Sequence, residues 1–474
     1  MEKQRKIGWR AAMAIVIANM IGTGVFTTLG FQLESVQSIW GILLLWIVGG
    51  VISLLGAFSY AEIGTHLPKS GGEYHFLSKT IHPLAGYLSG WVSLTVGFAA
   101  PVALAAMAMG AYLDKFSPIS GTVIAIASIL LISFVHSVNL RNSSLFQGAF
   151  TWLKVLLIIG MILAGLISFP TATPVEWSPN WSSEIFTPSF AIALIYVTYA
   201  YSGWNASAYI VGEIKNPNRN LPISLVGGTL LVSVLYVLLQ LTFLKQAPIQ
   251  ELASKVEVGQ VAAEYMFGQE AGKWVSFLIG FLLISSISAM IWVGPRISRA
   301  MADDYPFWHF LKKDNQAGIP VRAIWFQAGL SILMILSGRF EQILLYSGFI
   351  LQIFTTITVS TLFILRQKKT PHSYYKSPFY PVLQIVFILI STWMIIYMIS
   401  DKPTESLWGL INLAIGLLTY YISKQISSTT KKPLSNQLSV EIDGKKEKST
   451  NSTTIKRKLS SQNKPSPQKV STKA

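Results

Sequence analysis

Apolar residues fill long stretches of the chain, and short runs of charged and turn-forming residues separate these stretches. Most of the stretches reach the roughly 20 residues that an α-helix needs to cross the ~30 Å hydrocarbon core of a bilayer. The pattern predicts an all-α integral membrane protein with 12 membrane-spanning helices. The expected spans cover residues 10–33, 38–65, 83–112, 121–137, 144–169, 189–211, 222–245, 271–301, 321–338, 341–365, 380–400 and 405–424.

The first span carries an interruption in its middle. Ile21, Gly22, Thr23 and Gly24 place two glycines around a β-branched threonine, and each interior glycine costs a helix about 1 kcal/mol relative to alanine. A broken helix frees backbone N–H and C=O groups, which inside lipid must find partners or line a polar cavity. At a break, the N-terminus of the second half-helix attracts an anion and the C-terminus of the first attracts a cation. This motif therefore predicts a site for a zwitterion.

The sixth span carries a second interruption of the same kind. Tyr199 precedes a Ser202-Gly203 pair, and the amide of Asn205 follows within the apolar segment. Small residues also allow close helix packing, which is the alternative explanation of each motif. The two interruptions lie five spans apart, so an inverted duplication of a five-helix unit would bring them face to face inside the bilayer. This correspondence favours a binding site.

These features divide the chain into five parts. We expect a cytoplasmic N-terminus (1–9), a first five-helix repeat (10–169), an inverted second repeat (189–365), two further helices (380–424) and a basic tail (425–474). Counted with the adjoining span ends, the N-terminus and the loops on its side hold 18 Lys and Arg residues, whereas the opposite loops hold 6. The positive-inside rule therefore predicts that both termini are cytoplasmic, in a plasma or inner membrane.

Composition agrees with an integral membrane protein, because only 12% of the residues are charged, against about 25% in soluble domains. The tail is rich in Ser, Thr, Lys and Pro and is expected to be disordered. It carries much of the net charge of +16, so the basic balance does not indicate a nucleic acid partner. Its Lys456-Arg457-Lys458 cluster either contacts anionic membrane lipid or is simply solvated, and we favour solvation.

Lys154 lies near the middle of the fifth span. A lysine at that depth costs about 2.5–3.5 kcal/mol even on the lenient insertion scale, and its side chain is too deep to reach the interface easily. We favour a functional cation that faces the helix bundle over a tolerated snorkelling lysine. Such an ammonium group could bind the carbonyls of the broken first helix.

Other candidate chemistry is weak. The chain has no cysteine, which excludes a thiol nucleophile or a disulfide-linked subunit. Its six histidines lie at span ends or in loops without metal-ligand spacing, and no Asp or Glu lies deep in a span. The Ser70-Gly71-Gly72-Glu73 segment lacks the context of a phosphate loop and is interpreted as a cytoplasmic hinge. We therefore expect no enzyme activity, no cofactor and no metal site.

Four segments resemble the amino acid–polyamine–organocation (APC) transporters, and the sixth-span motif resembles their L-type amino acid transporter branch. The segments are residues 22–26 (Gly-Thr-Gly-Val-Phe), 68–74 (Pro-Lys-Ser-Gly-Gly-Glu-Tyr), 199–205 (Tyr-Ala-Tyr-Ser-Gly-Trp-Asn) and 213–217 (Glu-Ile-Lys-Asn-Pro). The resemblance extends over residues 8–425. It implies a LeuT-like fold with a 5+5 inverted repeat, discontinuous helices one and six, and two additional helices.

The resemblance also implies an α-amino acid substrate. Gly22, Thr23 and Gly24 would bind its carboxylate, and the Ile21 carbonyl would accept from its ammonium group. Tyr199, where this branch usually has phenylalanine, would act as a gate beside the sixth-helix break. Ser202, Gly203 and Asn205 complete the expected substrate-binding residues.

Sodium-independent members of the family carry a lysine at the position corresponding to Lys154, and Ser285 and Ser288 would complete that site. The expected protein is a sodium-independent amino acid carrier, either an exchanger or a proton symporter. The lack of acids deep in the spans favours neutral substrates. Eukaryotic L-type members often bind a heavy subunit through a cysteine, so this chain is expected to work alone. The alternative is an amino acid sensor that binds without net transport.

Overall fold

The computed structural model describes residues 7–138, 143–168, 181–185, 187–315, 318–368 and 373–427. This part of the chain is helical and contains no β-strand. Ten of its helices are long and apolar enough to cross a membrane. Residues 425–427 end the last helix, and the rest of the predicted tail, with its basic cluster, lies outside the described residues.

The ten candidate spans agree with ten of the predicted ones. They are Trp9–Thr27, α4 (Ile39–His66), Pro83–Leu113, α8 (Gly121–Val138), Gly148–Ile167 within α9 (Ser143–Ile167), α11 (Pro217–Gln246), α14 (Gln269–Asp304), α16 (Phe340–Leu365), α17 (Val382–Asp401) and Pro403–Ser427. The segments predicted at 189–211 and 321–338 contain shorter apolar helices, α10 (Pro188–Ala200) and α15 (Val321–Ser337). In the sixth segment the α-helix ends at Ala200, and turns follow at residues 201–205.

Two predicted spans are subdivided by local geometry. The first consists of α1 (Trp9–Met20), α2 (Gly24–Thr27) and α3 (Leu29–Gln32). The third consists of α6 (Pro83–Val92), a π-helical stretch η1 (Ser93–Ala99) and α7 (Ala100–Leu113). Short helices connect the spans: α5 (Gly72–Thr80), the 3₁₀ segment η4 (Ala206–Glu213), α12 (Ile249–Leu252) and α13 (Val258–Phe267).

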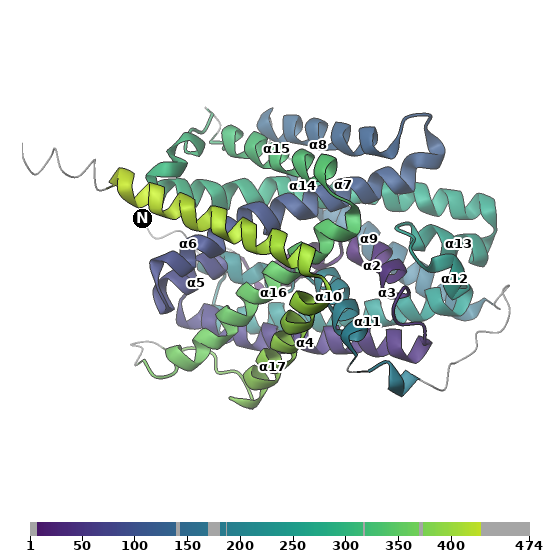
Figure 1. Ribbon diagram of the computed structural model, residues 1–474, viewed down its shortest axis with the longest axis horizontal. Coiled ribbons are helices and arrows are strands. Elements are labelled where there is room, and N and C mark those ends of the chain that lie inside the picture. The colour runs from purple at the N-terminus through teal and green to yellow at the C-terminus, as the bar shows by residue number, and fades with distance from the viewer. Residues whose placement is uncertain are drawn as a thin grey trace, which may run out of the picture.

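The helices form a bundle in which α14 packs along α7, α8 and α15, while α11 packs against α4 and α1 (Figure 1). The short helix α10 contacts α4, α16 and α17 in the interior. Large apolar side chains are exposed on the outer helices, as at Leu131, Trp152 and Leu389. An outward apolar surface of this kind suits contact with lipid.

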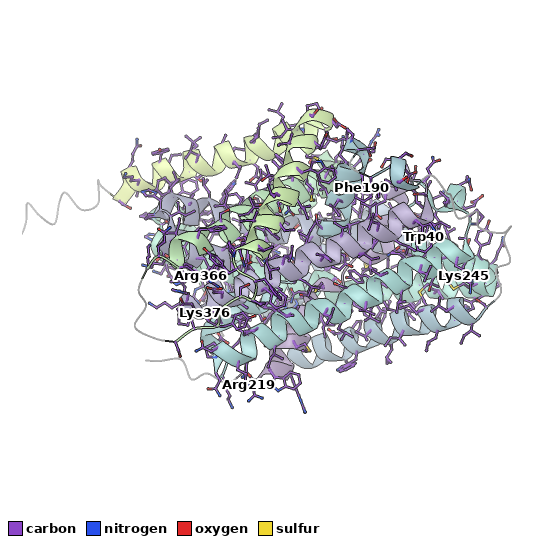
Figure 2. The ribbon with its side chains drawn as sticks, turned by 90° about the horizontal axis from the view of Figure 1, so that it is seen from below. Trp40, Phe190, Arg219, Lys245, Arg366 and Lys376 are labelled. Atoms are coloured by element: carbon purple, nitrogen blue, oxygen red, sulfur yellow. The ribbon has the colours of Figure 1, made fainter. Side chains whose placement is uncertain are left out.

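Charged side chains gather towards the ends of the bundle. Figure 2 places Arg219, Arg366 and Lys376 towards one end, and Lys245 towards the other. Arg366 makes a bidentate ion pair with Glu62 of α4, with Nε–Oε1 and Nη2–Oε2 distances of 2.7 and 2.8 Å. The Glu62 side chain is fully buried, so this pair fastens the end of α16 to α4.

Candidate functional site at two helix breaks

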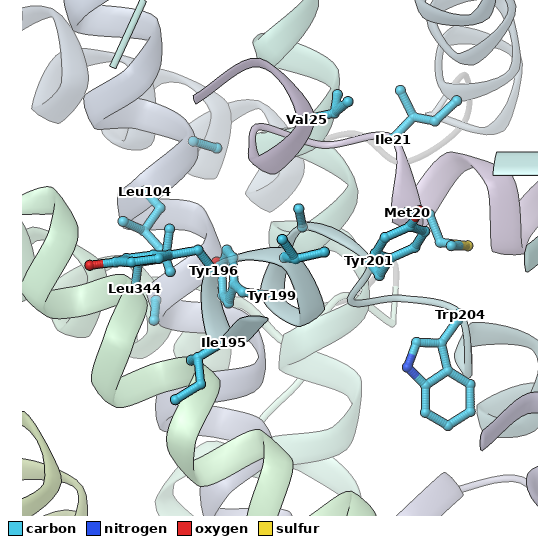
Figure 3. Close-up of a cluster of buried hydrophobic side chains, with 14 of the residues drawn as sticks. Met20, Ile21, Val25, Leu104, Ile195, Tyr196, Tyr199, Tyr201, Trp204 and Leu344 are labelled. Carbon is cyan, nitrogen blue, oxygen red and sulfur yellow. The ribbon is translucent and has the colours of Figure 1, made fainter. Parts of the chain in front are cut away.

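The first span is broken at the predicted glycine motif. Helix α1 ends at Met20, residues 21–23 are not helical, and α2 begins at Gly24. Figure 3 shows Met20 at the end of α1, Ile21 on this unwound stretch and Val25 on α2.

Side chains from other helices bind the carbonyl groups around this break. The bonds are Tyr236 Oη to Met20 O, Lys154 Nζ to Ile21 O at 3.2 Å, Gln240 Nε2 to Val25 O at 3.0 Å and Tyr112 Oη to Phe26 O at 2.7 Å. An unsatisfied carbonyl inside lipid costs several kcal/mol. The surrounding bundle therefore stabilises the break.

Lys154 lies on α9, is only 4% exposed, and connects three elements. Besides the Ile21 carbonyl, its ammonium donates to the hydroxyl of Ser286 on α14 at 2.7 Å. Ser285 and Ser288, expected at this site, flank that residue in sequence. Ser285 donates to the Leu282 carbonyl, and Ser288 lies 2.8 Å from Nε2 of His136.

The sixth segment is broken as well. Helix α10 ends at Ala200, residues 201–205 form turns, and η4 follows from Ala206. Gly203 adopts φ +99°, a conformation that residues with a Cβ rarely adopt. The Tyr201 hydroxyl donates to the Trp46 carbonyl of α4 at 2.9 Å and fixes the start of the turn.

The two breaks lie against each other. A Cβ atom on Gly24 would lie 2.5 Å from Cα of Ala200, and one on Gly203 would lie 2.7 Å from the carbonyl carbon of Asn19. Only glycine permits these two backbone approaches. The glycines of the motifs thus bring the broken segments together.

A cavity of about 320 Å³ lies beside the breaks. Its lining includes four of the expected residues: Tyr199, Ser202, Gly203 and Asn205. The first helix contributes Ala18 and Asn19 to the wall, whereas Ile21, Gly22, Thr23 and Gly24 are not among the lining residues. The cavity extends to Ile7 and Glu213, the side on which the N-terminal segment lies.

Sequence reasoning missed several residues of this wall. The amide of Asn19 precedes the break by two residues, and an amide within an apolar span could have signalled it. Gln352 of α16 also lines the cavity, and it too is an amide within an apolar span. The π-helical stretch η1 contributes Ser93, Gly97 and Phe98, and such stretches are frequent at functional sites. Pro101, which cannot donate to a carbonyl four residues earlier, is the sequence signal that could have marked this distortion.

Two acidic residues also line the cavity, and both come from outside the spans: Glu73 of α5 and Glu213 at the end of η4. The segment interpreted as a hinge therefore contributes a carboxyl group to the cavity wall. Among the residues that the structure describes, no cluster of three His, Asp or Glu side chains could hold a metal ion.

A multi-pass helical bundle with a cavity at two broken helices defines a membrane transport protein. The family model described as amino acid permease matches residues 7–422, so the chain belongs to this family of the APC superfamily. Its members are transporters rather than enzymes.

Curated relatives agree with this assignment. The chain is 30% identical over 444 residues to the serine/threonine exchanger SteT of Bacillus subtilis, covering 89% of this chain and 97% of that protein. It is 26% identical over 433 residues to the human b(0,+)-type amino acid transporter 1, covering 88% of each chain. The mouse large neutral amino acids transporter small subunit 2 is 26% identical over 434 residues, covering 88% of this chain and 81% of that one.

Proposed function

We propose that this protein is a sodium-independent carrier that moves amino acids, preferentially neutral ones, across the cell membrane by alternating access. The observation that carries the proposal is the position of Lys154. Its ammonium group binds the Ile21 carbonyl at the first break and Ser286 of α14. A fixed cation at this point does what a bound sodium ion would do, because it neutralises the partial negative charge at the end of α1.

The substrate would bind where the two breaks meet. In this proposal Gly22, Thr23 and Gly24 bind the carboxylate, and the Ile21 carbonyl serves the ammonium group. The cavity supports the pose because Ala18 and Asn19 bring its wall to within a few residues of that motif. Tyr199, buried in the wall, is the proposed gate over the substrate side chain.

The preference for neutral substrates rests on the state of the two acids in the wall. Glu73 already accepts hydrogen bonds from Tyr60 and Asn205. Glu213 lies at the end of η4 beside Ile7, away from the breaks, and its carbonyl accepts from the Ile7 N–H at 3.0 Å. Glu213 is therefore not placed to receive a cationic substrate side chain at the two breaks, and Oε1 of Glu73 is already occupied by donors from the protein.

We further propose a 5+5 inverted repeat with two additional helices, and cytoplasmic termini. Two breaks five spans apart support the repeat, and the Lys and Arg bias of the loops supports the orientation. The absence of cysteine from the sequence supports a carrier that works without a disulfide-linked subunit. Exchange and proton symport are both compatible with this mechanism.

Counterflow in proteoliposomes tests the proposal. Vesicles loaded with unlabelled alanine, leucine or arginine receive the labelled amino acid outside, with and without a sodium gradient. We expect counterflow of neutral amino acids that sodium does not change. Accumulation driven by sodium would contradict the role of Lys154, and arginine as the best substrate would contradict the neutral preference. Binding without any flux would instead support a sensor.

A further inference from the structure

A buried carboxyl group lies in the cavity wall without a cationic partner. Glu73, in the first turn of α5, is only 4% exposed although it lies outside the membrane spans. Its Oε1 accepts hydrogen bonds from the Tyr60 hydroxyl and from Asn205 Nδ2, the latter at 3.1 Å. In the described part of the chain, Oε2 accepts no hydrogen bond, and no ion pair includes Glu73.

The groups that face Glu73 are neutral at physiological pH. Tyr60 approaches from α4, and Asn205 and Tyr209 approach from the sixth-helix break and η4. The remaining helices that pack on α5 are α6 and α16, and α14 reaches α5 through Asp304, which accepts a hydrogen bond from Tyr74. The titratable Tyr87 of α6 bonds to Thr419 and Trp308 instead.

Charged groups at the two ends of α16 are engaged elsewhere. Glu341, at the start of α16, accepts a hydrogen bond from Tyr196. Arg366, just after α16, pairs with Glu62. His75 of α5 is held neutral, because burial, Lys69 and Lys79 lower its pKa. No described cation therefore stabilises the ionised form of Glu73.

This environment brings the titration of Glu73 into the physiological range. Burial raises the pKa of Glu73 to about 7, although the hydrogen bonds from Tyr60 and Asn205 oppose the shift. A carboxyl group with this pKa changes its charge in response to ordinary changes of cellular pH. Because Glu73 lines the cavity, water in the cavity can deliver the proton.

Glu73 also holds the start of α5 to the broken sixth segment. Next to it, the Gly71 N–H donates to the Tyr209 carbonyl at 3.0 Å. Gly72 packs so closely on Tyr209 that a Cβ would lie 2.4 Å from its ring. The charge-assisted bond from Asn205 to the carboxylate therefore adds to a contact that fastens the break to α5, and such bonds weaken when the acceptor is neutralised.

Building on the carrier function proposed above, we propose that Glu73 is a proton-binding site of this transporter. A proton from water binds the carboxylate, weakens its bond to Asn205, and frees the sixth-helix break to move. Amino acid exchange should then become faster as the pH falls on the side to which the cavity opens.

Counterflow of alanine at several pH values tests this inference in the wild type, E73Q and E213Q. Between about one pH unit above and one below its pKa, the protonated fraction of a group rises about tenfold. We expect the wild-type rate to rise by up to that factor between about pH 8 and about pH 6. E73Q should be fast and independent of pH, whereas E213Q, which changes the other acid of the cavity, should keep the wild-type profile. A flat wild-type profile, or a wild-type profile in E73Q, would overturn the inference.

A second measurement does not depend on transport. Infrared difference spectra of the purified wild-type protein should contain the C=O band of a protonated carboxyl group that disappears as the pH rises through about 7. The band should be absent from E73Q, or be shifted in E73D if E73Q does not fold. If the wild type shows this band but no counterflow, the carrier function fails and the proton site stands. A wild type without the band overturns the site itself.

Discussion

Gly24 and Ala200 lie in direct backbone contact, since a Cβ on Gly24 would be 2.5 Å from Cα of Ala200. The first residue after one break thus rests on the last helical residue before the other. Because the contact involves backbone atoms on both sides, no change of rotamer can relieve an added methyl group. The two breaks can meet only while position 24 is glycine.

Gly24→Ala should therefore separate the breaks and reduce counterflow by at least about fivefold, because overpacking of a close contact costs about 1–3 kcal/mol. Gly160→Ala is the matched control, as Gly160 lies within α9 and a Cβ there meets nothing within 4 Å. Initial rates of counterflow at equal amounts of reconstituted protein measure the effect. Equal rates for the two variants would show that the contact is dispensable.

Lys154→Met should abolish most counterflow, because the Ile21 carbonyl and Ser286 lose their shared donor. A buried acceptor left without a partner costs about 1–3 kcal/mol, which corresponds to a loss of roughly five- to 160-fold. Lys273→Met is the control, since Lys273 forms only an exposed ion pair with Glu270. A Lys154→Met variant with wild-type flux would remove the basis of sodium independence.

Arg366→Met should destabilise the protein by about 3–5 kcal/mol, because it leaves the fully buried carboxylate of Glu62 without its cationic partner. The double variant Arg366→Met/Glu62→Gln should recover part of this loss. Thermal unfolding of the purified protein in detergent measures both. If the single variant unfolds at the wild-type temperature, the ion pair does not hold α16 to α4.

The stability of the protein should depend on pH through Glu73. Its pKa in the fold is about 7, above the ordinary value of 4.5, so the folded state retains a proton that the unfolded state releases between these values. Stability contributed by this group is full below about pH 4.5 and is lost as the pH rises through about 7.

The thermal unfolding midpoint of the wild type should accordingly fall over this range, and E73Q should lack that component. The Glu213→Gln variant should retain it, since it leaves the Tyr60 and Asn205 bonds of Glu73 intact. Parallel midpoints for the wild type and E73Q at every pH would contradict the raised pKa.

The sequence alone determined the helical class, most of the spans and the positions of both breaks. These features depend on local chemistry: a sufficient length of apolar residues selects a membrane helix, and a Gly-Thr-Gly or Ser-Gly motif interrupts it. Such preferences act within one or two helical turns. For this reason Gly24 and Gly203 could be singled out before any contact was known.

Only the tertiary structure decided which side chains meet at the breaks. Successive residues of a helix point about 100° apart, so the choice of Ser286 as the partner of Lys154 depends on the rotation of α14. Glu73 is near Asn205 in space and 132 residues away in sequence, and Glu62 pairs with a residue 304 positions away. Long-range packing places Glu73 in the cavity wall and pairs Glu62 with Arg366. The residues next to these two glutamates in sequence do not indicate either position.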